Sequence, residues 1–347
     1  MKKQLRMKHL LLLCLLILVS AAGILLMGGR GPESRGGAEE NATIYSRHYA
    51  LITGDSDDEF WKQVYESARE AAAEKDIYVE WFGKNLSVSY SVKELLHMAI
   101  RAGVDGIILQ APDGQETEEL INESVDAGIP VVTVLSDCQS SLRQAYVGVN
   151  NYEIGLLYGE EIVRLILHQF SKNIRIMIVV GAEELTSSQS LALLGMREYI
   201  NGNLPKGYFV NVETELIPQE SSFATEEYIN SMFVSSAPLP DIMICLDERG
   251  TRCSYLSAVD HNRVGETAIV GYYSSKDTLA ALEKGILDSI LSVDAEEMGK
   301  SSVEVLLDYQ EYGYANTYNT VKIQLLDKED AARILERDRD NTEEGQE

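Results

Sequence analysis

Short apolar runs alternate along the chain with longer segments in which apolar residues recur at helical spacing. The short runs predict buried strands, and the longer segments predict amphipathic helices. The predicted strands are Tyr49–Thr53, Ile77–Phe82, Gly106–Gln110, Val131–Val134, Ala145–Val149, Arg175–Val180, Tyr208–Leu216, Asp241–Cys245, Ala268–Tyr272 and Leu287–Val293. The predicted helices are Glu59–Lys75, Ser91–Ala102, Thr117–Ala127, Tyr152–Phe170, Ser188–Asn201, Thr225–Ser235, Gly250–Asp260 and Lys276–Lys284. This order predicts an α/β fold with parallel sheets covered on both faces, and a chain of 347 residues is long enough for two such domains.

The segment that follows the strand Ala145–Val149 predicts a change of domain. Either Asn150 or Asn151 can cap the next helix. Gly155 and Gly159 lie one turn apart and leave one face of that helix bare enough for close packing. We therefore expect a hinge near Asn150.

An uncharged apolar run from Leu10 to Met27 follows the basic residues of the N-terminus. As a helix it would be about 27 Å long, close to the thickness of the hydrocarbon core of a membrane. Cleavage by signal peptidase at the small residues Ser20–Ala22 is the alternative, but apolar residues continue beyond that point, which favours an uncleaved anchor. Cys14 follows leucines where a lipidation signal needs small residues, so we interpret it as apolar filler.

The positive-inside rule places the basic residues 1–8 in the cytoplasm, the segment 9–27 in the membrane and residues 30–347 outside. Residues 28–47 are rich in Gly, Glu and Ser without apolar periodicity, which predicts a flexible linker. The expected location is therefore the outer face of the cell membrane, with a single membrane span.

The charge and the residue types exclude several functions. The net charge of −25 repels phosphate backbones, so we expect no nucleic-acid partner; the acidity serves solubility or attracts cations. Cys138, Cys245 and Cys253 lack metal-ligand spacing, and buried free thiols are favoured over a Cys245–Cys253 disulfide. The histidines are scattered, so neither a metal nor a cofactor is expected. Phosphate loops, nucleophile elbows and zinc-protease motifs are missing from the sequence, which argues against an enzyme.

Six sequence pieces, in order, resemble the type I periplasmic binding proteins of the ribose and galactose receptor kind. They are Phe60–Trp61, AGVDGIIL (Ala102–Leu109), GIPVVTV (Gly128–Val134), YVGVNNYEIG (Tyr146–Gly155), IVGYY (Ile269–Tyr273) and MGKSSVEVLL (Met298–Leu307). The resemblance implies two Rossmann-like lobes joined by three crossovers, near Asn150, near Val293–Asp294 and near Thr317–Thr320, with hinge residues Asn150, Val293 and Thr317. The implied lobes are 48–149 with 294–317 and 150–293 with 318–337, followed by an acidic disordered tail, 338–347. We expect a monomeric ectodomain.

The family closes its lobes on a small polar solute, with aromatic rings against the faces of a sugar. Phe60 and Trp61 stand where the family places those rings, although both could simply belong to the first turn of a core-facing helix. Asp58 could accept hydroxyl protons or cap that helix. The full set of candidate ligand-binding residues is Asp58, Phe60, Trp61, Gln110, Ser136, Asp137, Ser188, Asp247, Tyr273 and Asp294.

Several polar ligands that the resemblance implies are missing. Leu135, Leu246, Tyr273 and Val293 stand where sugar receptors of the family carry acids or amides, and the expected arginine is replaced by polar residues around Ser187–Ser190. A buried hydroxyl without a partner costs about 1–3 kcal/mol, so we do not expect the ordinary sugar site to be intact. The solute is then less hydroxylated, the alignment slips by a residue or two, or the domain contacts a protein instead.

The resemblance leaves two functions. The first is a receptor that captures a sugar or sugar-like solute and delivers it to an ABC permease. The second is a sensor co-receptor that signals to a membrane histidine kinase. A transcription regulator with the same fold is excluded because a predicted membrane helix, and no DNA-binding helical segment, precedes the domain.

Overall fold

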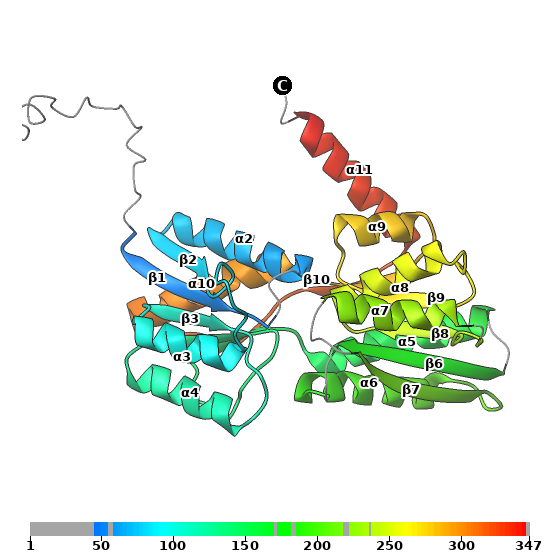
Figure 1. Ribbon diagram of the computed structural model, residues 1–347, viewed down its shortest axis with the longest axis horizontal. Coiled ribbons are helices and arrows are strands. Elements are labelled where there is room, and N and C mark those ends of the chain that lie inside the picture. Colours follow the sequence, from blue (N-terminus) through cyan, green and yellow to red (C-terminus); the bar gives the residue numbers. More distant parts are fainter. Residues whose placement is uncertain are drawn as a thin grey trace, which may run out of the picture. The chain divides into compact units, whose positions relative to one another are not determined.

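A computed structural model describes residues 45–54, 58–169, 172–181, 185–217, 222–235 and 237–344, which contain two six-stranded sheets (Figure 1). The first sheet has the strand order β11-β5-β4-β3-β1-β2, and its strands pair in parallel. Its strands are β1 (Arg47–Ile52), β2 (Ile77–Trp81), β3 (Gly106–Leu109), β4 (Val131–Val134), β5 (Ala145–Gly148) and β11 (Tyr318–Thr320).

The second sheet has the order β12-β10-β9-β8-β6-β7. Its strands are β6 (Asn173–Gly181), β7 (Phe209–Ile217), β8 (Ile242–Cys245), β9 (Ala268–Tyr272), β10 (Ser289–Val293) and β12 (Ile323–Leu326). The strand β12 runs antiparallel to β10, and the other pairs are parallel. The expected α/β fold is confirmed, with this one antiparallel pair as an addition.

Helices cover both faces of each sheet (Figure 1). On the first sheet, α2 (Glu59–Ala73) and α10 (Ala295–Tyr312) cover one face, and α3 (Val92–Ala102) and α4 (Gln115–Asp126) cover the other. On the second sheet, α5 (Asn151–Gln169) and α6 (Ser187–Asn203) cover one face, and α7 (Ser222–Val234), α8 (Glu248–Asp260) and α9 (Lys276–Glu283) cover the other. We call each sheet with its helices a lobe.

Local sequence signals fix the helix ends. Ser91 begins α3 with a capping box, in which its hydroxyl accepts from the backbone of Glu94 and the Glu94 carboxylate accepts from the backbone of Ser91. Gly103 ends the same helix in the left-handed conformation, with φ of 67°. The strands between such ends are almost wholly apolar, as expected for strands buried on both faces.

The expected close packing on the first helix of the second lobe is confirmed. A Cβ atom on Gly155 would lie 2.1 Å from the carbonyl oxygen of Ala192, and one on Gly195 would lie 2.4 Å from the carbonyl oxygen of Tyr152. The backbones of α5 and α6 therefore touch, which only glycine permits. This contact fixes the start of α6 relative to Asn151, at the edge of the candidate site.

Three connections cross between the lobes. They run through Asn150 after β5, through Asp294 after β10, and through Val321–Lys322 between β11 and β12. The Val321 N–H donates to the carbonyl of Gly148 at 2.8 Å, and the Asp294 N–H donates to the carbonyl of Lys322 at 3.0 Å, so the connections are hydrogen-bonded to their neighbours. Because β11 pairs with β5 in the first sheet, the third crossing lies directly after Thr320, at the end of the expected range Thr317–Thr320 and beyond the hinge residue Thr317.

Two expectations concern the ends of the chain. Residues 338–344, expected in a disordered tail, continue the helix α11 (Lys328–Glu344), which begins by packing on α9 and β12. Residues 1–44, with the predicted cytoplasmic tail, the anchor and most of the linker 28–47, lie outside the described residues. Arg47, the last residue of the predicted linker, begins β1. Within the described ranges, no helix has the length and apolar character needed to cross a membrane.

Candidate functional site

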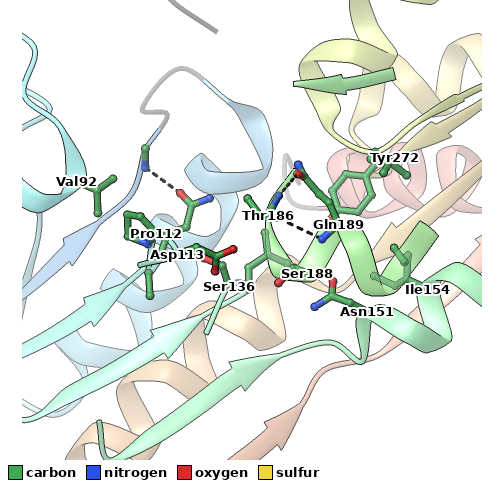
Figure 2. A pocket seen from close by; sticks show the side chains of 16 residues that line it. Val92, Pro112, Asp113, Ser136, Asn151, Ile154, Thr186, Ser188, Gln189 and Tyr272 are labelled. Carbon is green, nitrogen blue, oxygen red and sulfur yellow. Dashed lines mark hydrogen bonds between the residues drawn. The ribbon is translucent and has the colours of Figure 1, made fainter. Parts of the chain in front are cut away.

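A cavity of about 300 Å³, here called the inner cavity, lies beyond the carboxyl ends of strands from both sheets. In Figure 2, Val92, Pro112, Asp113 and Ser136 of the first lobe lie opposite Ile154, Gln189 and Tyr272 of the second. Its lining residues are Gly54, Val92, Gln110, Ala111, Pro112, Asp113, Leu135, Ser136, Asn151, Ile154, Thr186, Ser188, Gln189, Ala192, Leu246 and Tyr272. Parallel α/β sheets bind ligands at this end of their strands.

The walls of the inner cavity are mainly apolar. Val92, Leu135, Ile154, Leu246 and the ring of Tyr272 supply most of the surface, and burial raises the pKa of the Tyr272 phenol far above its usual range, which keeps it neutral. A ligand in this cavity is therefore held chiefly by burying its own apolar surface.

Two amides add polar groups to the inner cavity. The Oε1 atom of Gln110 accepts from the N–H of Gly54 at 2.8 Å, and Oε1 of Gln189 accepts from the N–H of Thr186 at 2.9 Å (Figure 2). Neither amide nitrogen donates a hydrogen bond to another described residue, so each remains a donor for a ligand. These few groups suffice to orient a ligand that is otherwise held by apolar contact.

A larger cavity of about 1160 Å³, here called the outer cavity, shares Pro112, Asp113, Asn151 and Ser188 with the inner one. Its other lining residues are Gly114, Gln115, Glu118, Asp137, Cys138, Gln139, Ser140, Tyr146, Val149, Asn150, Ser187, Leu191, Tyr318 and Thr320. Amides, carboxylates and hydroxyls predominate here, in contrast to the inner cavity. The two cavities thus join a mainly apolar space to one with a more polar lining.

Aromatic residues of the two lobes meet outside the inner and outer cavities. Phe60 of α2 and Tyr273, which follows β9, meet edge to face at 5.2 Å between ring centroids and an interplanar angle of 86°. Trp61 meets Phe60 at 5.2 Å in the same manner. Phe60 and Trp61 are 2% and 4% exposed. Their rings pack against protein in the way that the core-facing alternative described, and neither lines the inner or the outer cavity.

Leu135 and Tyr273 follow the equivalent strands β4 and β9 of the two sheets, and both have a left-handed backbone. Their φ angles are 60° and 67°. The N–H of Leu135 donates to the carbonyl of Val147 at 3.0 Å, and the N–H of Tyr273 donates to the carbonyl of Leu291 at 2.8 Å. A bulky residue in this conformation costs about 1–3 kcal/mol, and such strain clusters at ligand-binding positions. The strain turns each side chain toward the region between the lobes.

A direct contact between the lobes lies where the two cavities meet. The carboxylate of Asp113, in the loop before α4, accepts from the backbone N–H of Ser187 at 2.6 Å and from its hydroxyl at 2.9 Å. Ser187 is the first residue of α6, where a negative charge is favoured by the helix dipole. Asp113 therefore links the first lobe to the helix that carries Ser188 and Gln189.

Asp137, a predicted ligand-binding residue, takes part in a buried ion pair. Its carboxylate contacts the guanidinium of Arg143, with 2.6 Å between Oδ2 and Nη2, and accepts from the Thr133 hydroxyl at 2.6 Å. The Arg143 side chain is only 3% exposed and lies 5.1 Å from the ring centroid of Tyr318. These contacts neutralise both charges and hold the wall of the outer cavity.

The structure places the other predicted residues at different points. Gln110, Ser136 and Ser188 line the inner cavity. Tyr273, Val293 and Asp294 line a third cavity, of about 530 Å³, and Asp294 caps α10. Asp58 caps α2, accepting from Phe60 and Trp61, while Asp247 accepts from the backbone of Gly181 and Gly250. The helix-cap alternative thus describes the observed hydrogen bonds of Asp58, and the ligand-binding roles stay predictions.

The sequence interpretation missed several lining residues. Val92, Asp113, Ile154, Gln189 and Tyr318 come from loops and helix faces whose relation to the strand ends is not local in sequence. Tyr272 was missed although it precedes the candidate Tyr273, because alternation along a strand places neighbours on opposite faces. Of these, only Asp113 carried a signal, since an acid after a buried strand lies at the binding edge of the sheet.

The described cysteines and acidic residues do not form a metal-binding group. Cys138, Cys245 and Cys253 are buried free thiols, so the expectation of free thiols is confirmed. Among the residues with described positions, no group of three or more His, Cys, Asp or Glu side chains could hold a metal ion.

The comparison with known families now identifies the class. Residues 49–313 match the family model described as the periplasmic binding protein domain, so the chain belongs to this family, and the expected family is confirmed. The matched segment begins within β1 and ends just after α10, so it includes every residue that lines the inner cavity and all strands except β11 and β12. No curated protein matches the chain.

Solved structures share the fold at low sequence identity. XylFII has a TM-score of 0.69 at 24% identity, covering 81% of this chain and 98% of its own. The glucose-galactose binding protein GanP of Geobacillus stearothermophilus has the same score and identity, with 82% and 98% covered. A solute-binding protein of Burkholderia graminis, in complex with D-arabinose, has a TM-score of 0.71 at 17% identity, with 82% and 96% covered. The fold is thus that of sugar-binding periplasmic proteins.

Proposed function

We propose that the protein is an extracytoplasmic receptor that captures a small solute, sugar or sugar-like, between its two lobes and delivers it to an ABC permease. The observation that carries this proposal is the inner cavity, because both lobes supply its walls beyond the carboxyl ends of their strands. A solute there contacts Leu135 and Gln110 from one lobe and Leu246 and Gln189 from the other. Binding then favours the closed arrangement of the lobes.

A thermal-shift screen across sugars, polyols, nucleosides and amino acids tests solute binding. Replacing Leu246 with Trp fills the inner cavity, so it should remove the shift caused by any solute that binds there. Leu256→Trp is the matched control, since Leu256 is 44% exposed on α8 and lines neither cavity. Equal shifts for both variants would place the solute elsewhere. A panel without any shift would exclude these four classes of solute.

Attachment to the membrane is part of the proposal and rests on the apolar run Leu10–Met27. The full-length protein should fractionate with membranes and resist extraction by high salt, because the anchor is held by hydrophobic burial. A freely soluble species that begins near Gly23 would show that the segment is cleaved instead. An uptake assay in a strain lacking the protein tests delivery to a permease.

A sensor co-receptor is the second candidate, and direct lobe-to-lobe contacts favour it. The ring contact of Phe60 with Tyr273 and the hydrogen bonds of Asp113 with Ser187 join the lobes through protein alone. A receptor whose lobes associate in this way suits protein contact as well as transport. XylFII, which shares the fold, has also been solved as a XylFII–LytSN complex, with a TM-score of 0.69 at 24% identity.

Small-angle scattering with and without saturating solute, combined with the uptake assay, distinguishes the transport receptor from the sensor co-receptor. Transport predicts a smaller radius of gyration with solute and a loss of uptake in the deletion strain. The sensor predicts normal uptake and a lost transcriptional response to the solute. A radius of gyration that stays constant despite proven binding would mean that the cleft does not close on its ligand.

A further inference from the structure

We infer that the inner and outer cavities together bind one amphipathic solute, with an apolar end in the inner cavity and an uncharged hydroxyl-rich end in the outer cavity. An alkyl or aryl glycoside has this chemistry. The inference rests on the proposed solute-binding function and names the substrate class of the same site. It starts from the continuity of the two cavities, whose common wall contains Pro112, Asp113, Asn151 and Ser188.

The inner cavity selects an apolar group. Its volume of about 300 Å³ is at the lower end for small-molecule pockets, and Val92, Leu135, Ile154 and Leu246 offer no hydrogen bond to a hydroxyl. A sugar ring placed there would leave the hydroxyls that face these four side chains without a partner, although Gln110 and Gln189 could pair with others. A hydrocarbon group instead gains about fourfold in affinity for each methylene that it buries, until the cavity is filled.

The outer cavity selects hydroxyl groups. Gln115, Gln139, Asn150 and Ser140 provide donors and acceptors, and these side chains are exposed to solvent within the cavity. Tyr318, which is 49% exposed, offers an aromatic face on the same wall. Amides around an aromatic ring suit a polyhydroxylated group, which has an apolar face as well as hydroxyls. Such a group keeps its hydroxyls paired here and would lose those pairs in the inner cavity.

The charges in the outer cavity disfavour an anionic ligand. Asp113 and Glu118 are acidic, and among the described residues the Asp113 carboxylate accepts from Ser187 and the Glu118 carboxylate accepts from Ser140. Arg143 cannot compensate, because its side chain is 3% exposed and paired with Asp137. A carboxylate on the solute would therefore face two negative charges without a cationic partner among the described residues of this wall.

The polar end of the solute is placed next to the contact between the lobes. Asp113 belongs to both cavities and bonds to Ser187, and Ser188 follows on the same helix. A solute that spans both cavities passes this point and touches both lobes along its length. It therefore adds contacts between lobes that neither a sugar alone nor a hydrocarbon alone could make.

The first test measures binding of a matched series to the full-length protein by isothermal titration calorimetry. The probes are glucose, hexanol, and methyl, butyl and hexyl β-D-glucopyranoside. We expect affinity to rise with chain length by about fourfold per methylene and hexyl glucoside to exceed both glucose and hexanol by at least about tenfold. Equal affinity for glucose and hexyl glucoside would overturn the inference, and so would equal affinity for hexanol and hexyl glucoside.

Variants locate the two ends of the solute. Leu246→Asn should reduce the dependence of affinity on the length of the alkyl chain, whereas Leu256→Asn, at an exposed position of α8, should leave it unchanged. Tyr318→Ala should weaken all three glucosides by a similar factor and preserve the dependence on chain length. Tyr314→Ala is its control, because Tyr314 is 74% exposed and lines neither cavity. Thermal melts of each variant check folding, and a chain-length dependence unchanged in Leu246→Asn would overturn the assignment.

A charged probe completes the design. Hexyl β-D-glucuronide has the same tail as hexyl glucoside with a carboxylate on the sugar, and it should bind at least about tenfold more weakly because of Asp113 and Glu118. Stronger binding of the glucuronide would overturn the choice of an uncharged end. If plain sugars in the thermal-shift panel bind and the glucosides gain nothing, the inference fails while the proposed function stands. Silence of the panel and of the series together refutes both.

Discussion

The contact between Phe60 and Tyr273 is predicted to couple the stabilities of the two lobes. The rings meet edge to face at 5.2 Å, and the side chains are 2% and 9% exposed, so the contact is almost fully removed from water. Edge-to-face pairs contribute about 0.5–1.5 kcal/mol beyond the burial of their area. Replacing both residues with Leu should therefore give a coupling free energy of about that size in a double-mutant cycle.

The backbone conformation of Tyr273 predicts a second difference in the free energy of unfolding at the same position. An L-residue in the left-handed region at φ of 67° costs about 1–2 kcal/mol, which glycine avoids. Glycine also loses about 0.5–1 kcal/mol through its freedom in the unfolded chain. Both Tyr273→Ala and Tyr273→Gly lose the ring, so the glycine variant should be more stable than the alanine variant by about 0.5–1 kcal/mol.

Urea unfolding followed by circular dichroism measures these free energies. The control cycle pairs Phe60→Leu with Phe233→Leu, because Phe233 lies in a separate core cluster on the far face of the second sheet. That cycle should be additive within about 0.3–0.5 kcal/mol. A Phe60–Tyr273 coupling as small as that of the control would refute the aromatic contact between the lobes. An alanine variant as stable as the glycine variant would refute the strain.

Three further predictions concern packing, charge and thiols. Gly155→Ala should destabilise the protein by about 1–3 kcal/mol, because its Cβ would meet a backbone carbonyl at 2.1 Å, whereas Gly202→Ala, with open space around it, should be neutral or stabilising in urea unfolding. Burial raises the pKa of Glu248, so the protonated carboxyl stabilises the fold at low pH, and this contribution is lost as pH rises through the folded pKa. Glu248→Gln should therefore raise the melting temperature at pH 7 but not at pH 4. An equal gain at both pH values would contradict burial as the cause. Burial raises the pKa of Cys245 to about 12 and that of Cys253 to about 11, so both thiols should react with Ellman's reagent only after unfolding, and rapid labelling of the folded protein would show that they are accessible.

The sequence determined the elements and the class of fold, because those signals are local. The strand Val131–Val134 is apolar except for Thr133 and has the predicted bounds, and Ser91 and Gly103 mark the ends of α3 as capping residues. Gly155 predicted the close packing of α5, because the missing side chain can be read from the sequence. The order of strands and helices then leaves few topologies, because parallel strands need crossover helices.

Two features at the ends of helices could not be predicted from the sequence. Asp58 fits the sequence equally well as a ligand and as a helix cap, whereas Asp247 was predicted only as a ligand. Only the folded backbone provides the N–H groups from which both side chains accept. The continuation of α11 through residues 338–344 was missed because the acidic composition of the tail resembles that of disordered segments.

The cavities were decided by the tertiary structure alone. The pairing of Phe60 with Tyr273, of Asp137 with Arg143 and of Asp113 with Ser187 joins residues from different loops or lobes, and no local pattern encodes such partners. The apolar replacements Leu135 and Leu246 were visible in the sequence, but the space between them is a property of how two sheets meet. Side-chain periodicity depends on neighbours along the chain, whereas a cavity depends on contacts between distant segments. For this reason the sequence predicted only a few of the residues that line the inner cavity, such as Gln110 and Ser188, and not the volume of the cavity.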